Sequence, residues 1–96
     1  MEGKPVSTPS AVRWDDSRMK RSRADVCNVS ASADEVVLSF GTLLPAAGAD
    51  ALPVVAIGDR LVLSPAVARE LTAMLEQVVR DHEARFGPLP EPAPAR

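Results

Sequence analysis

One long amphipathic helix constrains this chain more than any other feature of its sequence. Ser64 is a good N-cap residue, and Pro65 follows at the first helical position, where its missing N–H removes no hydrogen bond. Gly87 and Pro88 form the expected stop. Between these limits, apolar side chains recur at three- and four-residue spacing, which indicates a helix with one buried face. This stripe consists of Val67, Leu71, Met74, Leu75, Val78 and Phe86.

Two shorter segments before the helix show the period-two pattern of half-buried strands. The first covers residues 24–32 and the second covers residues 35–40, with a short polar turn between them. This spacing predicts an antiparallel hairpin, and we expect Gly41 to end its second strand. The predicted apolar faces hold Cys27, Val29 and Ala31 on the first strand, and Val36, Leu38 and Phe40 on the second.

The apolar residues 52–63 allow two interpretations. Gly58 and Asp59 could form the turn of another hairpin, or Gly58 could be a bulge within one long strand. We favour one bent strand, because two four-residue strands would be very short. Residues 45–51 are small and turn-rich, and we expect a loop there. The expected fold class is therefore α+β, with a small antiparallel sheet of about three strands followed by one long C-terminal helix.

The folded part is small for such a helix. We expect a basic N-terminal arm at residues 1–23, a core domain at residues 24–87 and a disordered Pro-rich tail at residues 88–96. A core of roughly 60 residues buries only about 60% of its unfolded surface, and one cysteine allows no internal disulfide. The helix spans about 33 Å, whereas a six-residue strand spans about 20 Å. We therefore expect a homodimer or larger homo-oligomer with an interface formed by Leu71, Met74, Leu75, Val78 and Phe86.

Charge is divided unevenly along the chain. Residues 1–23 carry six Lys and Arg against three acidic residues, and the remainder carries five Arg against ten acidic residues. The acidic core does not favour nucleic acid as a partner. The arm does contain a compact basic cluster, made of Arg18, Lys20, Arg21 and Arg23.

Trp14 is an unexpected residue in an otherwise polar arm. Large aromatic side chains dominate the energetics of many interfaces. Two roles remain open: Trp14 anchors the arm to another protein, or it packs on its own sheet or on a neighbouring subunit. As a protein-binding segment, the arm would use Trp14 with Arg13, Asp15, Asp16 and Met19.

The sequence offers little for catalysis, and we expect no enzyme, no cofactor and no metal. His82 is the only histidine and lies beside the apolar helix stripe, so we interpret it as structural. Cys27 is the only cysteine, and we expect it to be a small buried side chain. No apolar stretch follows the first residues and no run approaches the roughly 20 apolar residues of a membrane helix. We therefore expect a cytoplasmic protein without membrane insertion.

Several segments carry a resemblance to a known family. They read ADVCNVSAS at residues 24–32, EVVLSFG at residues 35–41, LVLSPAVAR at residues 61–69 and RFG at residues 85–87. These segments are similar to a bacterial domain of unknown function, family 3467, and the WDDSRM sequence at residues 14–19 looks like one branch of it. Arg23 departs from the aromatic residue expected there, and residues 46–51 are smaller and less polar than expected.

The resemblance implies a strand-strand-strand-helix fold with one continuous third strand, and it brings no established activity. The general shape also resembles the SecB-type export chaperones, as a fold-level likeness only. We expect a non-enzymatic accessory or adaptor protein that forms a homo-oligomer and docks onto a larger protein assembly or a client chain. The alternative is a regulator that contacts nucleic acid through its basic arm.

Overall fold

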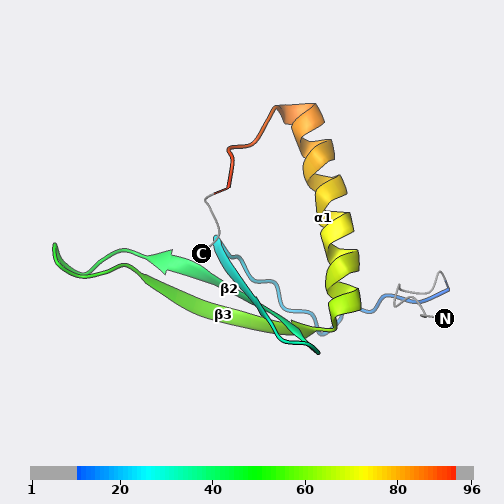
Figure 1. Ribbon diagram of the computed structural model, residues 1–96, viewed down its shortest axis with the longest axis horizontal. Helices are drawn as coiled ribbons and strands as arrows, with labels where there is room; N and C mark the ends of the chain where they lie inside the picture. The colour runs from blue at the N-terminus through cyan, green and yellow to red at the C-terminus, as the bar shows by residue number, and fades with distance from the viewer. Residues whose placement is uncertain (1–10, 93–96) are drawn as a thin grey trace.

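The computed structural model describes residues 11–92, where three strands are followed by one helix (Figure 1). The elements are β1 (Val26–Ala31), β2 (Val36–Leu44), β3 (Val54–Leu63) and α1 (Pro65–Phe86). The strands form one antiparallel sheet in the order β1-β2-β3. The predicted α+β fold class is confirmed. Residues 1–10 of the predicted arm and 93–96 of the predicted tail lie outside the described residues.

The register of the strands separates two faces of the sheet. Phe40 is opposite Cys27 on β1 and Asp59 on β3. The preceding residue on β2, Ser39, is opposite Asn28 on β1 and Arg60 on β3. Because side chains alternate between faces along a strand, these two sets lie on opposite sides. We call the first side the Phe40 face; its apolar residues in the three-stranded region are Cys27, Val29, Ala31, Val36, Leu38, Phe40, Leu61 and Leu63.

A bulge in β3 resolves the uncertainty at Gly58 in favour of one bent strand. Phe40 pairs with Asp59 and the adjacent Gly41 pairs with Ile57, so Gly58 is the extra residue. The prediction that Gly41 ends the second strand is wrong, because β2 continues to Leu44. A Cβ on Gly41 would overlap the carbonyl oxygen of Ala56 and lie 2.9 Å from its carbonyl carbon. Gly41 therefore permits the close approach of β3 at the bulge and does not mark a strand end.

Local capping fixes both ends of α1. The Ser64 Oγ accepts a hydrogen bond from the Val67 N–H at 3.2 Å, and Pro65 occupies the first turn. At the other end, Gly87 has a φ of 97° and its N–H donates to the Glu83 carbonyl oxygen at 2.9 Å. These observations confirm the helix that the sequence predicts, with the same first and last residues.

The sheet and α1 do not enclose a common core. The helix rises away from the sheet, and its contacts with β3 are sparse (Figure 1). Among residues 11–92 no apolar side chain is buried, and Ser39 is the only buried polar one, at 7% exposure. The radius of gyration is 17.1 Å, whereas a compact domain of this size has about 12 Å. A single chain therefore leaves its apolar surface open to solvent.

The lengths of the elements correct one step of the sequence argument. β3 has 10 residues, which correspond to about 33 Å, and the 22 residues of α1 also correspond to about 33 Å. The prediction that the helix is longer than its sheet is therefore wrong, because β3 is as long as α1 and β2 continues four residues beyond its predicted end at Phe40. The apolar stripe is exposed because the helix points away from the sheet.

Candidate interaction surfaces

The arm between residues 11 and 23 contains no strand or helix but does contain one turn. The Met19 N–H donates to the Asp16 carbonyl oxygen at 3.1 Å, and the Ser17 N–H donates to Asp15 Oδ1 at 3.0 Å. The hydroxyl and then the N–H of Ser17 hold the pKa of the Asp15 carboxyl below its usual value. The turn is therefore favoured with Asp15 ionised, and this contribution is lost as the pH falls through the lowered pKa.

Trp14 lies immediately before this turn and is 80% exposed. Trp14 therefore does not pack on the sheet of its own chain, which was one of the two roles predicted for it. Met19 on the other side of the turn is 65% exposed, and Arg13, Asp15 and Asp16 are also exposed. The structure thus brings the five predicted arm residues together around one turn, with the indole available for contact. A partner protein or a neighbouring subunit remains the open choice.

The second half of the arm runs beside the Phe40 face. Lys20, Ser22 and Ala24 border a shallow depression whose other walls include Phe40 and Leu61. All four members of the basic cluster are exposed; they are Arg18, Lys20, Arg21 and Arg23. The depression therefore places one basic side chain, Lys20, and one acidic side chain, Asp59, beside the apolar Phe40 and Leu61.

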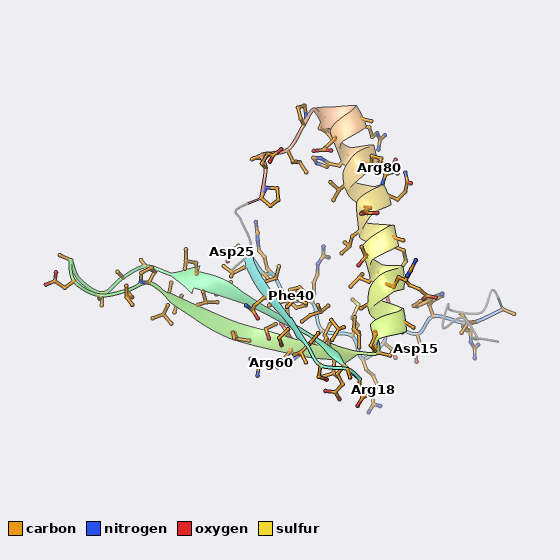
Figure 2. All side chains as sticks on the ribbon, in the orientation of Figure 1. Asp15, Arg18, Asp25, Phe40, Arg60 and Arg80 are labelled. Carbon is orange, nitrogen blue, oxygen red and sulfur yellow. The ribbon has the colours of Figure 1, made fainter. Side chains whose placement is uncertain are left out.

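The Phe40 face lies toward α1. Figure 2 shows Phe40 on the side of the sheet toward which the helix rises, and Arg60 on the other side. On this other side the Arg60 Nε donates to the Ser39 Oγ at 2.9 Å, which places a charged side chain over the centre of the sheet. The two faces therefore differ at the centre of the sheet, where the Phe40 face is apolar and its reverse is polar.

The predicted oligomer interface on α1 is exposed beyond its first turns. Met74, Leu75, Val78 and Phe86 are exposed by 60, 52, 63 and 72%, whereas Leu71 is half-buried. At the end of the stripe, the rings of His82 and Phe86 are in contact, with centroids 4.9 Å apart. We call the five residues Leu71, Met74, Leu75, Val78 and Phe86 the helix stripe.

The polar side of α1 carries an i,i+4 ion pair between Glu76 and Arg80. Arg80 Nη2 and Glu76 Oε1 are 3.9 Å apart, and both side chains are about two-thirds exposed. Such an exposed pair contributes little to stability. Asp81 accepts a hydrogen bond from Gln77 Nε2 at 2.9 Å in place of an ion pair with Arg85. The polar side is thus a solvated surface.

Cys27 lies at the predicted position on the Phe40 face but is exposed, so the prediction of a buried side chain is wrong for the single chain. The physical reason is that α1 does not cover this face. Within residues 11–92, no three or more His, Cys, Asp and Glu side chains gather into a group suited to a metal ion. No helix in the described part of the chain is long and apolar enough to span a membrane.

One apolar surface escaped the sequence analysis. Beyond the end of β1, strands β2 and β3 continue as a two-stranded ribbon with exposed Leu43, Leu44, Val54 and Val55. The Asp25 Oδ1 accepts a hydrogen bond from the Leu43 N–H at 3.1 Å, at the point where β1 pairing stops. The apolar Leu43 and Leu44, which follow Gly41, are the sequence signal for this ribbon.

The fold and these surfaces define the chain as a small α+β protein with a meander of three antiparallel strands and a projecting C-terminal helix. The family model described as Protein of unknown function (DUF3467) matches residues 1–91, and the chain belongs to this family. Comparison with curated proteins gave no match. Comparison with solved structures gave no match either.

Proposed function

We propose that this protein is a non-catalytic accessory or adaptor protein that self-associates and docks onto a larger protein assembly or a client chain. The observation that carries the proposal is the lack of any buried apolar side chain among residues 11–92. Apolar burial is the main favourable term in folding, so a chain with this exposed area requires further contacts. Self-association supplies contacts for the helix stripe, and the arm with Trp14 remains available for another protein.

We propose that the protein is located in the cytoplasm. The single exposed thiol of Cys27 suits a reducing environment. A chaperone-like action on client chains is compatible with the proposal, because exposed apolar strands such as the ribbon around Leu43 and Val55 can bind extended segments. The arm is the preferred docking element, because Trp14 is 80% exposed there.

Sedimentation velocity at micromolar concentration tests the self-association. We expect a dimer or larger species and no stable monomer. A compact monomer that resists heating would contradict this part of the proposal, because it would mean that a single chain buries its own apolar residues.

Tryptophan fluorescence tests the docking role, since Trp14 is the only tryptophan. We expect red-shifted emission that is readily quenched in the isolated protein, followed by a blue shift with bound partner. For partner capture, tagged wild type is compared with Trp14→Ala and with the matched arm variant Val12→Ala, since Val12 is also exposed. A blue, protected emission in the isolated oligomer would instead assign Trp14 to a subunit interface, and Trp14→Ala would then lower the stability of the oligomer.

The exposed basic cluster favours nucleic-acid regulation as a second candidate function. A titration of single-stranded nucleic acid at increasing salt distinguishes it, since counterion release makes such binding steeply salt-dependent. Four phosphate contacts would give a slope of about −3 in log K against log salt. Binding that is absent at low salt would exclude this candidate.

A further inference from the structure

We propose that two copies of the chain exchange their helices, so that the helix stripe of each copy packs on the Phe40 face of the other. The inference rests on the self-association proposed above and specifies its geometry. The Phe40 face, on which Val29 and Leu61 are exposed, is then covered by α1 of a second copy. Three features of the structure support this arrangement: the strand–helix link, the dimensions of the two surfaces and the area that they offer.

The link between β3 and α1 is too short for a helix to fold back onto its own sheet. Only Ser64 separates Leu63, the last residue of β3, from Pro65, the first residue of α1. Ser64 is extended, with φ −68° and ψ 155°, and its side chain is engaged in the helix cap. Pro65 further fixes its own φ and restricts Ser64 to extended conformations. A connection between a strand and a helix that packs on the same sheet usually has about two to six residues. A shorter, strained connection favours exchange of the element between two chains.

The two exposed surfaces match in size. The stripe lies on a helix about 33 Å long and about 10 Å wide. Strands β2 and β3 run together for about 30 Å, and β1 widens the sheet to about 10 Å between its outer strands over about 20 Å of this length. A helix from a second copy can therefore cover the Phe40 face along its whole length. Figure 2 shows Phe40 on the side of the sheet toward which α1 rises, so the Phe40 face and the helix lie on the same side of the sheet.

The area is sufficient for a stable dimer. One helix on one sheet covers a footprint of about 330 Å², taken from a helix length of about 33 Å and a width of about 10 Å. A two-fold pair contains two such contacts with two surfaces each, which gives at most about 1,300 Å². Specific protein interfaces bury about 1,200–2,000 Å². A dimer in which only one helix is exchanged, or in which only sheet edges pair, would leave a helix stripe or a Phe40 face exposed to solvent.

A cross-linking experiment uses Cys27, which is exposed on the Phe40 face and is the only cysteine. Chains that carry both Cys27→Ala and Met74→Cys are mixed with wild-type chains that carry a tag, so that the two differ in size. The mixture is unfolded and then refolded. A short bismaleimide cross-linker is then added. Exchange predicts a covalent heterodimer between the cysteine at position 74 of one chain and Cys27 of the other. Val78→Cys serves as a second stripe position if the first variant folds poorly.

Matched controls assign each outcome. Ala73→Cys lies on the opposite side of α1 and is expected to give at least a tenfold lower yield of heterodimer. Cross-linked homodimers of the Cys27→Ala, Met74→Cys chain would show that the stripes pair with each other and would overturn the exchange. In a chain with both Cys27 and Met74→Cys, a cross-linked monomer would show closure of α1 on its own sheet and would also overturn it. A monomer in sedimentation would overturn the proposed self-association as well, whereas a dimer without the heterologous cross-link overturns the exchange alone.

A loop insertion gives an independent test. Five residues, Gly-Ser-Gly-Ser-Gly, inserted between Leu63 and Ser64 would allow α1 to fold onto its own sheet. We expect the dimer dissociation constant to rise at least tenfold, with a folded monomer in sedimentation. The same insertion between Gly48 and Ala49, in the connection from β2 to β3, is expected to leave the dimer intact. An unchanged dimer after the insertion at Leu63 would contradict the exchange.

Discussion

The helix and the sheet of this protein are held by interactions of different range. In α1, the Ser64 Oγ and the Val67 N–H that it caps are three residues apart in sequence. In the sheet, Arg60 hydrogen-bonds to Ser39 across 21 positions, and Gly41 allows the close approach of Ala56. The comparison shows that local interactions define where the helix begins and ends. Neither element buries its own apolar residues, so both depend on contacts from outside the single chain.

The largest expected effect comes from a charge on the helix stripe. Leu75→Glu places a carboxylate at the centre of the apolar surface, where burial of an unpaired charge is strongly unfavourable. We expect the dimer dissociation constant to rise by more than about 100-fold, equivalent to about 2.7 kcal/mol, or the chain to unfold. Sedimentation measures the first outcome and circular dichroism the second.

Ala73→Glu is the matched control for this variant, because it adds the same charge on the opposite side of α1. Its dissociation constant should stay within about twofold of wild type. Equal weakening by both variants would mean that net charge, and not burial of the stripe, controls assembly.

A smaller effect is expected from Gly41→Ala, which tests the long-range character of the sheet. The added Cβ meets backbone atoms of Ala56, and backbone atoms cannot move away as a flexible side chain can. We expect a loss of about 1–3 kcal/mol in the free energy of unfolding, measured by urea denaturation. The control is Gly58→Ala, whose Cβ would meet no atom within 4 Å. Equal stability of the two variants would argue against the close approach of β2 and β3.

Ser64→Ala tests the local character of the helix and should have a smaller effect. The variant removes the acceptor for the Val67 N–H, and loss of an N-cap typically lowers stability by about 1 kcal/mol. Ser22→Ala, in the exposed arm, is the control and should leave the urea midpoint unchanged. A Ser64→Ala protein as stable as wild type would show that tertiary contacts, not the cap, set the start of α1.

Deletion of residues 88–96 should have the smallest effect. The Leu89 N–H donates to Glu83 Oε2 at 2.9 Å, but this hydrogen bond is exposed to solvent and contributes little. We expect the melting temperature to stay within experimental error, as the predicted dispensable tail requires. A decrease of several degrees would show that the tail packs on the folded protein.

The difference in range also explains what the sequence could predict. The bounds of α1 follow from Ser64, Pro65 and Gly87, whose effects act within a few residues. The end of β2 could not be predicted in this way. A glycine that ends a strand and a glycine that permits the close approach of a neighbouring strand have the same local sequence pattern. Only the pairing with β3, about 15 residues later, distinguishes them.

The candidate surfaces show the same contrast. The composition of the helix stripe could be predicted from spacing, and the turn next to Trp14 brings the predicted arm residues together. The exposure of Cys27 could not be predicted, because it depends on the direction in which α1 leaves the sheet. The β2 half of the ribbon, which contains Leu43, could not be predicted, because Gly41 has the local pattern of a strand end.

The single-residue connection at Ser64 has a consequence for folding kinetics under helix exchange. A helix such as α1 can form within about a microsecond, since its contacts are local. Its stripe is covered only after a second chain is found, so the step that completes the native state is bimolecular. The half-time of refolding should then fall as protein concentration rises. Newly made chains would carry uncovered apolar surface for a time that depends on how many copies surround them, and the abundance of the protein would determine how quickly each copy matures.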